Sequence, residues 1–311
     1  MTQVAVTPRS FRETPGPHHD ALGRHGLKAR FSDVDHLLAA DEMVDLVRGC
    51  SGLIVGLDPV SAAVLEAGPV RAVVKFGSGL DNIDTDLLEQ RGVPLATTEG
   101  ASSRSVAELA IALLFALARN VVEHDRLIRG GAWKRHNGTE LAGKRLGIVG
   151  FGRIGKDVAR IALGLGMEVV AHDPYAKIEE VESAPLDELI TTSDAVSLHL
   201  PLTEETRSII GPREIKLFRS GALLVNTARG GVVDEEALAD ALDQGRLGGV
   251  AFDAFVEEPP SSSPLPGHPN FISSPHAGAA TTEAVIRSGV MAVEKIARLL
   301  QAGSSDVRSE H

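Results

Sequence analysis

The stretch Leu146-Gly-Ile-Val-Gly-Phe-Gly-Arg-Ile-Gly155 decides the fold of this chain of 311 residues. Its first four residues form an apolar run that predicts a buried strand, and residues 154–165 carry apolar side chains at helical spacing. Gly150, Gly152 and Gly155 lie between the two in the order G-x-G-x-x-G. In this context the first glycine permits a tight turn, the second lets the backbone approach a pyrophosphate, and the third lets the helix pack on the strand. We therefore predict a strand–turn–helix unit that holds the phosphates of a dinucleotide at the helix N-terminus.

An acidic residue, Asp173, comes at the end of the next predicted strand. A carboxylate at this position accepts hydrogen bonds from the adenosine ribose hydroxyls and repels the 2′-phosphate of NADP. The alternative is a glycine-rich turn in a purely structural unit. Strand, helix and acid occur together here, so we predict a dinucleotide site and NAD as the cofactor.

The rest of the chain alternates short apolar runs with amphipathic stretches, which is the pattern of βαβ units and parallel sheets. Its length suits two domains. The predicted strands are residues 4–6, 53–55, 72–75, 94–97, 145–149, 168–171, 195–198, 222–226, 249–252 and 271–273. The predicted helices are residues 34–47, 61–66, 154–165, 212–217, 234–244 and 286–300. Two proline-rich segments, residues 15–20 and 257–270, are predicted as loops.

A long apolar stretch, rich in Ala and Leu, starts at Ser105 and ends at Ile128. We predict one long helix here, apolar on more than one side, which the other domain or a second subunit must bury. The longest uninterrupted apolar run, residues 109–118, is shorter than the roughly 20 residues that cross a bilayer. We therefore expect no membrane partner.

Composition narrows the possible functions. Asp and Glu number 42 against 31 Lys and Arg, a net charge of −11, so nothing offsets phosphate repulsion and we expect no nucleic-acid partner. Cys50 is the single cysteine, which excludes an intramolecular disulfide and a cysteine-based zinc site. No His-x-x-x-His pair or acidic cluster has metal-ligand spacing, and the N-terminus lacks the pattern of a secretory signal. We expect no metal, and a cytoplasmic location.

Polar residues follow three of the predicted strands. Arg229, Asp253 and His276 come after residues 222–226, 249–252 and 271–273, and the carboxyl ends of parallel strands are where ligands bind. An arginine can grip a carboxylate with two parallel hydrogen bonds. A histidine, with an ordinary pKa near 6.5, can donate and accept a proton near neutral pH. Glu258 could stabilise that imidazole when it is protonated. Taken singly, each has a structural alternative, because a histidine before Ala-Gly, an Arg-Gly-Gly and a Glu-Glu-Pro-Pro are commonly parts of turns. Six other histidines are interpreted as surface groups: His18, His19, His25, His36, His124 and His136.

Seven motifs follow one another along the chain. They are Lys75-Phe-Gly-Ser-Gly-Leu-Asp-Asn-Ile-Asp84, Ser105-Val-Ala-Glu108, Leu141-Ala-Gly-Lys-Arg-Leu-Gly-Ile-Val-Gly-Phe-Gly-Arg-Ile-Gly155, His199-Leu-Pro-Leu-Thr-Glu-Glu-Thr206, Val225-Asn-Thr-Ala-Arg-Gly-Gly-Val-Val-Asp234, Phe252-Asp-Ala-Phe-Val-Glu-Glu-Pro259 and Ser274-Pro-His-Ala-Gly278. With them the chain resembles the D-isomer-specific 2-hydroxyacid dehydrogenase family, and within it the short D-3-phosphoglycerate dehydrogenase-like members. The resemblance implies an NAD-dependent oxidoreductase that acts on a small anionic 2-hydroxy or 2-oxo acid.

The resemblance also implies an architecture. The fold class is α/β, with two Rossmann-like, doubly wound parallel-sheet domains and an interdomain cleft. Residues 1–99 plus 283–311 would form a flavodoxin-like substrate-binding domain, and residues 100–282 the NAD-binding Rossmann domain. The family is usually dimeric through the helix that matches Ser105 to Ile128, so we expect a homodimer, with Trp133 just beyond that helix.

Residue roles carry over position by position. The catalytic positions are matched by Arg229, Glu258 and His276. The cofactor-binding positions are matched by Gly150, Gly152, Arg153, Ile154, Gly155, Asp173, Leu200, Pro201, Thr206, Thr227, Ala228 and Asp253. The substrate-binding positions are matched by Gly77, Ser78 and Gly79, whose backbone would cradle the carboxylate, with Lys75 and Arg229.

Departures from the family pattern leave the substrate open. Gly56-Leu-Asp-Pro59 stands where the phosphoglycerate enzymes carry an arginine, and their C-terminal regulatory domain is not in this sequence. One alternative is the same chemistry on a phosphonate, a phosphorus oxyanion or a sulfonate, with Lys75, Arg104 and Arg9 as candidate anion contacts, unless all three are surface charges. A further alternative is an NAD-sensing, corepressor-like binding protein.

Overall fold

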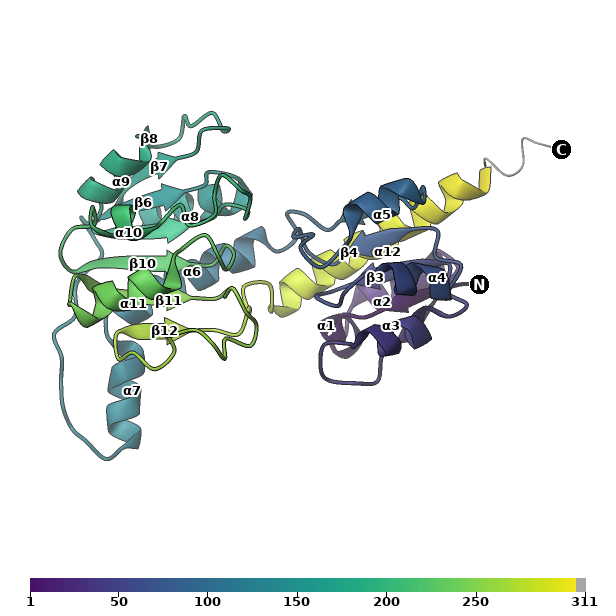
Figure 1. Cartoon of the computed structure of the whole chain (residues 1–311), viewed down its shortest axis with the longest axis horizontal. Coiled ribbons are helices and arrows are strands. Elements are labelled where there is room, and N and C mark those ends of the chain that lie inside the picture. Colours follow the sequence, from purple (N-terminus) through teal and green to yellow (C-terminus); the bar gives the residue numbers. More distant parts are fainter. Residues whose placement is uncertain (306–311) are drawn as a thin grey trace. The chain divides into compact units, whose positions relative to one another are not determined.

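The computed structural model describes residues 1–305, and these form two compact units (Figure 1). The first unit contains Met1–Ser102 together with the segment that starts at Ala279, and the second contains Ser103–Gly278. Residues 306–311, the last part of the predicted substrate-binding domain, lie outside the described residues. Each unit holds its own parallel sheet, so the prediction of two parallel-sheet α/β domains is confirmed.

The first unit contains a five-stranded parallel sheet with the strand order β2-β1-β3-β4-β5, the flavodoxin-like order. The strands are β1 Thr2–Val6, β2 Leu27–Phe31, β3 Gly52–Val55, β4 Val73–Lys75 and β5 Leu95–Thr97. The helices are α1 Arg9–Glu13, α2 Pro17–Arg24, α3 Ala40–Val47, α4 Ala62–Ala67, α5 Thr85–Gln90 and α12 Thr282–Ser305. Because β3 and β4 are buried on both faces, they read as continuous runs of apolar residues in the sequence.

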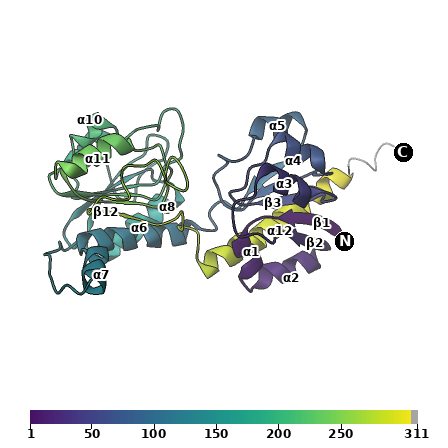
Figure 2. The ribbon, with the colours of Figure 1, turned by 60° about the horizontal axis from the view of Figure 1, so that its bottom comes forward.

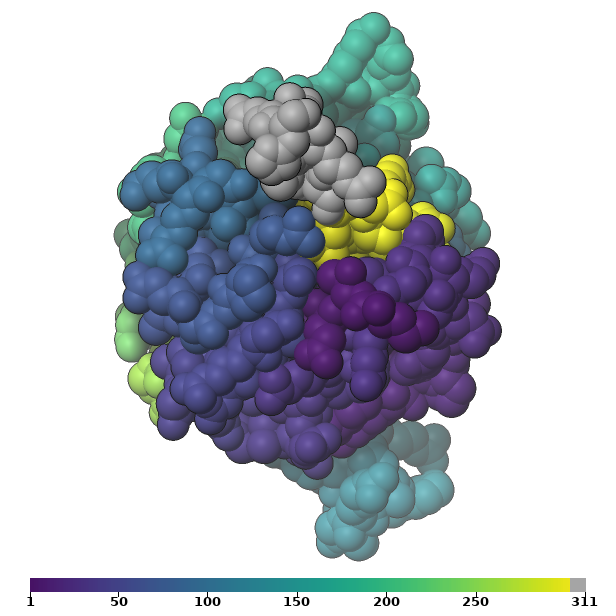
Figure 3. All heavy atoms as spheres, turned by 90° about the vertical axis from the view of Figure 1, so that its right-hand side faces the viewer, coloured from purple at the N-terminus to yellow at the C-terminus, as the bar shows by residue number. Residues whose placement is uncertain are grey.

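Helices cover both faces of this sheet. Helices α3 and α4 pack on one apolar cluster, and α1, α2 and α12 pack on the other (Figure 2). The α12 helix, from the end of the chain, packs on α2, and its surface lies beside the N-terminal part of the unit (Figure 3). The first unit is therefore built from the two ends of the chain.

The second unit contains a seven-stranded parallel sheet with the order β12-β11-β10-β9-β6-β7-β8. The strands are β6 Arg145–Val149, β7 Glu168–His172, β8 Glu182–Ser183, β9 Ala195–Leu198, β10 Ala222–Asn226, β11 Leu247–Phe252 and β12 Phe271–Ser273. The helices are α6 Ser103–Ala118, α7 Val121–Arg129, α8 Arg153–Gly164, α9 Leu186–Thr192, α10 Pro212–Ile215 and α11 Glu235–Asp243. Helices α6 and α8 cover one face, and α9, α10 and α11 cover the other. Figure 2 shows α10 and α11 on the opposite side of the sheet from α6. The strand order reverses between β6 and β9, which is where doubly wound sheets bind ligands.

The single helix predicted from Ser105 to Ile128 is wrong. The helix breaks between α6 and α7, which are bent by 63° at Asn120, a residue with a φ of 52°. Asparagine tolerates this left-handed conformation better than most residues, but the sequence offers no proline or glycine to reveal the break. Within residues 1–305 no single helix has the length and apolar character to cross a membrane, although the bent pair α6 and α7 together passes that test.

Other sequence expectations also fail locally. Residues 17–20 of the predicted loop 15–20 begin α2, because Pro17 occupies the first helical turn, where its missing N–H costs nothing. The helix predicted at 34–47 starts only at Ala40. The edge strands β2 and β8 were not predicted, since β2 alternates charged with apolar residues and β8 has only two residues.

His18 is a core residue rather than a surface group. Its exposed fraction is 0%, its ring contacts Phe11 edge-on, and its Nε2 lies 3.0 Å from the Phe11 carbonyl oxygen. Burial lowers the pKa of His18, and the nearby His19 lowers it further, so the ring is neutral at pH 7. A Cβ at Gly16 or Gly289 would lie within about 3 Å of this ring, so both glycines make room for it.

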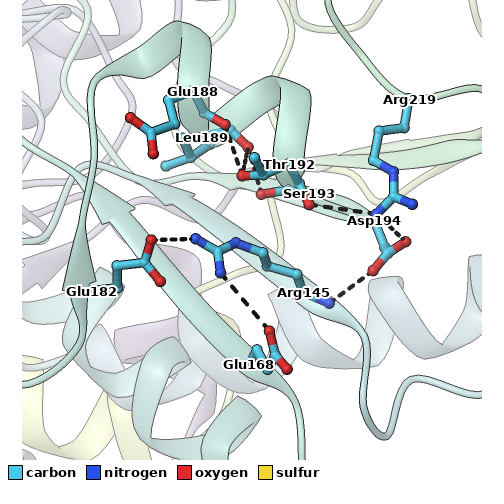
Figure 4. Close-up of polar contacts among 9 residues, drawn as sticks. All are labelled: Arg145, Glu168, Glu182, Glu188, Leu189, Thr192, Ser193, Asp194 and Arg219. Carbon is cyan, nitrogen blue, oxygen red and sulfur yellow. Dashed lines mark hydrogen bonds and ion pairs between the residues drawn. The ribbon is translucent and has the colours of Figure 1, made fainter.

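A polar cluster closes the amino edge of the second sheet (Figure 4). The carboxylate of Asp194 accepts a hydrogen bond from the Arg145 backbone N–H at 2.9 Å and another from the Arg219 guanidinium at 3.0 Å. The Arg145 side chain contacts Glu182 and Glu168. Its Nε is buried with no hydrogen-bond partner among residues 1–305. Asp194 therefore connects the first residue of β6 to the turn that precedes β10.

We predict that Asp194→Ala destabilises the second unit. The substitution leaves a backbone N–H at the edge of the sheet without its acceptor, which typically costs about 1–3 kcal/mol. Urea unfolding followed by circular dichroism should show a lower midpoint. Arg219→Ala is the matched control, because its exposed ion pair contributes only about 0–1 kcal/mol. An Asp194→Ala midpoint equal to that of the control would contradict the role assigned to the carboxylate.

Candidate active site

The glycine turn between β6 and α8 contains backbone packed directly on backbone. A Cβ at Gly150 would lie 2.4 Å from the His199 carbonyl oxygen, and a Cβ at Gly155 would lie 2.2 Å from the Gly150 carbonyl oxygen. A Cβ at Gly152, in contrast, would meet no atom of the chain within 4 Å. Packing therefore requires glycine at positions 150 and 155, whereas at 152 the missing side chain leaves room for a group that the chain itself does not supply.

The start of α8 is suited to bind an anion. Gly152 is its N-cap, and no side chain caps the first turn, to which Arg153, Ile154 and Gly155 belong. The backbone N–H groups of a first turn carry a partial positive charge and favour phosphate. The turn and the helix start thus fit the pyrophosphate of a dinucleotide.

Asp173 lies directly after β7 and binds the same turn. Its Oδ2 accepts a hydrogen bond from the Phe151 N–H at 2.8 Å, and its Oδ1 accepts from the N–H groups of Tyr175 and Ala176 at 2.9 and 3.1 Å. This carboxylate holds the loops after β6 and β7 together at the carboxyl edge. Binding of a ribose by Asp173 stays a prediction.

The loop after β9 brings together three of the residues predicted to bind the cofactor. The Thr206 hydroxyl donates to the Pro201 carbonyl oxygen at 2.6 Å and accepts from the Thr203 N–H at 2.7 Å, so Leu200, Pro201 and Thr206 belong to one tight turn. Tyr175, from the loop after β7, donates a hydrogen bond to the carboxylate of Glu205 in this turn.

His199 is a site residue that the sequence did not single out. Its Nε2 lies 2.8 Å from the Ser197 hydroxyl, and its Nδ1 lies 3.4 Å from that of Thr227. Removal from water lowers the pKa of His199, so the imidazole is neutral at pH 7. It packs between the loops after β9 and β10 as a structural polar group.

Arg229 follows β10 in a turn shaped by Asn226. The Asn226 side chain is fully buried; its Oδ1 accepts from the Ala228 N–H at 3.0 Å and its Nδ2 donates to the Arg229 carbonyl oxygen at 2.9 Å. Thr227 and Ala228 are buried in this turn, and Arg229 is half-buried. A Cβ at Gly230 would lie 2.0 Å from the Phe255 carbonyl oxygen, so the turn packs directly on the loop after β11.

His276 and Glu258 form a pair at the carboxyl edge. The His276 Nδ1 lies 2.9 Å and 3.0 Å from the two Glu258 carboxylate oxygens, and about one third of each side chain is exposed. Burial opposes ionisation of Glu258. The hydrogen bond and charge of His276, together with the Phe255 N–H and the charge of Arg229, outweigh it, so the pKa of Glu258 is lowered. Glu258 is therefore ionised at pH 7 and orients the imidazole so that its Nε2 points away from the carboxylate.

Asp253 holds the loop that carries His276. It is 3% exposed, and its carboxylate accepts from the Ser274 hydroxyl and from the N–H groups of Ala277 and Gly278 at 2.7 and 2.8 Å. Its carbonyl oxygen accepts from the His276 N–H at 2.9 Å. These contacts surround His276, which adopts a φ of 53°, a conformation that non-glycine residues rarely adopt. The resemblance implied that Asp253 binds the cofactor, and the sequence gave no sign of this supporting role.

The predicted carboxylate loop lies in the first unit, at the carboxyl edge of β4. Gly77 has a φ of 133°, and its N–H donates to the Thr98 hydroxyl at 2.7 Å. Ser78 is exposed, and Gly79 is half-buried. Lys75 is only 4% exposed, and its ammonium donates to the Gly56 carbonyl oxygen at 2.6 Å. The alternative that Lys75 is a surface charge is therefore wrong.

The structure thus brings the predicted catalytic and cofactor-binding residues together on one edge of the seven-stranded sheet. The predicted substrate loop occupies the same edge of the other sheet. Within the described residues no group of His, Cys, Asp and Glu side chains could hold a metal ion.

A doubly wound sheet with this glycine turn and an acid–base pair on the same edge defines a dinucleotide-binding α/β protein. The family model described as D-isomer specific 2-hydroxyacid dehydrogenase, NAD binding domain, matches residues 111–278. The chain is 41% identical over 269 residues to the hydroxypyruvate reductase of Thermotoga maritima, an alignment that covers 83% of this chain and 88% of that protein. The chain belongs to the D-isomer specific 2-hydroxyacid dehydrogenase family and contains its NAD-binding domain.

Two further comparisons agree. The chain is 38% identical over 274 residues to the D-3-phosphoglycerate dehydrogenase of Methanocaldococcus jannaschii. This alignment covers 85% of this chain but only 52% of that protein. The chain thus spans about half the length of that relative. The crystal structure of the TT0316 protein from Thermus thermophilus matches with a TM-score of 0.88 and 36% identity, covering 97% of both chains.

We predict that Asp253→Asn loosens the loop that carries His276. The amide would turn an NH₂ group toward the N–H of Ala277 or Gly278, and one lost acceptor in a buried site costs about 1–3 kcal/mol. Hydrogen exchange of residues 274–278 should accelerate. Asp243→Asn, at an exposed position of α11, is the control, and equal exchange in the two variants would refute the supporting role of Asp253.

Proposed function

We propose that this protein is an NAD-dependent dehydrogenase that interconverts a small 2-hydroxy acid and its 2-oxo acid. The observation that carries the proposal is the His276–Glu258 pair beside Arg229, on the sheet edge where the glycine turn opens. The names of the relatives, hydroxypyruvate reductase and D-3-phosphoglycerate dehydrogenase, support a substrate of this class.

Bound NAD(H) supplies or accepts the hydride. In the direction of reduction, Arg229 orients the substrate carboxylate through its guanidinium. His276, protonated, donates its Nε2 proton to the oxygen of the substrate carbonyl, and in oxidation it accepts that proton. Glu258 stabilises the imidazolium and fixes the ring orientation from the Nδ1 side. Asp173, with its negative charge, favours NAD over NADP. Binding of the carboxylate by the Gly77–Gly79 loop stays a prediction.

A plain 2-oxo acid is favoured over a substrate with a second anionic group. The three basic residues considered for such a group are all engaged by the chain. Arg9 pairs with Glu13 and Asp35, Arg104 pairs with Glu108, and Lys75 donates to Gly56.

A spectrophotometric screen of 2-oxo acids with NADH and NADPH tests the proposed function. We predict turnover of small 2-oxo acids with NADH, weaker turnover with NADPH, and loss of turnover in His276→Ala and Arg229→Ala. A positioned general acid contributes about 10²–10⁴-fold to the rate, so the His276→Ala loss should be at least that large. Both variants should still bind NADH.

Two results would reject the proposal. Near-normal kcat in either variant would remove the role of that residue. Failure of the unsubstituted protein to turn over any acid, together with tight NADH binding, would favour a cofactor-sensing binding protein. Preference for NADPH would contradict only the role of Asp173.

We also propose that α7 contributes to a homodimer. None of its nine residues is buried, although Val121, Val122 and Ile128 are apolar, and Trp133 beyond it is 83% exposed. Its acidic residues, Glu123 and Asp125, are balanced by Arg126 and Arg129 within the helix. A surface that is apolar and neutral in charge suits pairing with a second copy of itself.

Sedimentation equilibrium tests the homodimer. We predict a dimer for the unsubstituted chain and a monomer for the variant Val122→Asp/Ile128→Asp, because buried unpaired carboxylates oppose association. Leu37→Asp, at an exposed apolar residue of the first unit, should leave the dimer intact. A monomeric unsubstituted chain, or a dimeric Val122→Asp/Ile128→Asp variant, would contradict this proposal.

A further inference from the structure

Lys75 sits inside the first unit rather than at its surface. It ends β4 and is 4% exposed. Its ammonium donates to the Gly56 carbonyl oxygen at 2.6 Å and to the Oδ1 of Asn82. The side chain passes under the Gly77 loop, since a Cβ at Gly77 would lie 3.8 Å from the Lys75 Cε. Burying an ammonium group costs free energy of folding unless its N–H groups find acceptors. These hydrogen bonds are therefore needed for Lys75 to be buried.

Asn82 completes the same network. Its Nδ2 donates to the Gly56 carbonyl oxygen at 3.1 Å and to the Asp58 carbonyl oxygen. The backbone carbonyl oxygen of Asn82 accepts from the Val60 N–H at 2.9 Å. The side chain of Asp58, 5% exposed, then accepts from the Leu38 N–H at 2.9 Å. Asn82 therefore connects the loop after β3 to the loop after β4.

The loop after β4 is also held by residue Thr98, which follows β5. Thr98, after β5, accepts from the Gly77 N–H at 2.7 Å, and its own N–H donates to the carbonyl oxygens of Lys75 and Gly77, each at 3.0 Å. The loops after β3, β4 and β5 thus form one hydrogen-bonded platform. Lys75 and Asn82 hold the side that includes Gly56 and Asp58.

We infer that Lys75 and Asn82 are a positioning pair for substrate binding: they fix the loops at 56–60 and 77–79, and Lys75 acts through these loops and not as a contact to the substrate. The consequence for specificity is that the Lys75 ammonium already donates to the Gly56 carbonyl oxygen and to the Oδ1 of Asn82. A second anionic group on the substrate would have to displace one of these contacts to receive a hydrogen bond from Lys75. The kinetic consequence rests on the proposed function, whereas the structural consequence does not.

Hydrogen exchange on the full chain tests the structural part. Lys75→Met and Asn82→Ala should each accelerate exchange at residues 56–60 and 77–80, while affinity for NADH stays unchanged. Lys28→Met, an exposed lysine on β2, is the matched control. Asn82→Ala keeps the Lys75 charge and serves as the second variant should Lys75→Met fold poorly. Exchange equal to that of the control in both segments would overturn the inference.

Steady-state kinetics test the consequence for the substrate. The panel contains 2-oxo acids with one anionic group and phosphonate analogues with two. We expect kcat/KM to fall about 10- to 100-fold, mainly through KM and by the same factor for every acid, because a displaced loop misplaces any carboxylate. The double variant should lose less than the product of the single losses, since both residues act on one network.

A loss confined to acids with a second anionic group would overturn the inference, because Lys75 would then contact the substrate. Additive losses in the double variant would also contradict it. If the unsubstituted protein turns over no acid, the proposed function fails while the exchange experiment still decides the positioning role.

Discussion

The carboxyl edge of the second sheet depends on backbone packed against backbone where no side chain fits. Gly150 lies against the His199 carbonyl, Gly155 against the Gly150 carbonyl, and Gly230 against the Phe255 carbonyl. The first and third contacts each join two loops that follow different strands. The second joins the start of α8 to the end of β6. A methyl group at any of the three would overlap a carbonyl oxygen, and the loops would have to separate. These contacts therefore hold the turn after β6 to the loop after β9, and the turn of Arg229 to the loop after β11.

Carboxylates and amides then fix what the glycines bring close. Asp173 binds the glycine turn, Asn226 shapes the turn of Arg229, and Asp253 binds the loop of His276. All three stand at or just after the end of a strand, where backbone N–H groups leave the sheet and need acceptors. The same geometry that exposes these groups to a ligand therefore also requires nearby polar side chains that bind the backbone of the loops.

The sequence predicted the buried strands well because parallel strands covered on both faces leave continuous apolar runs. It failed where burial is decided by tertiary neighbours. Nothing local marks the break at Asn120, and the two histidines after Pro17 read as polar although Phe11 and α12 enclose His18. The catalytic candidates were identifiable by their position after strands, but Asn226 and His199 were not. Asn226 was predicted as the last residue of a strand, although its buried side chain bonds the turn that follows. The hydrogen bond of His199 to Thr227 joins loops far apart in the chain.

Lys75 shows why a strand-end position alone cannot assign a role. From the sequence, a lysine at the end of β4 beside a glycine loop is equally suited to face a ligand or the neighbouring loop. The choice depends on whether Gly56 presents a carbonyl within reach, and that is set by the parallel pairing of β3 with β4, in which Val55 lies opposite Lys75. The first unit thus holds its loops with a buried cation, whereas the second unit holds its loops with glycine contacts and buried carboxylates. The cation of the first unit therefore contacts its own loops, and in the second unit ionised Glu258 contacts the His276 ring that it orients.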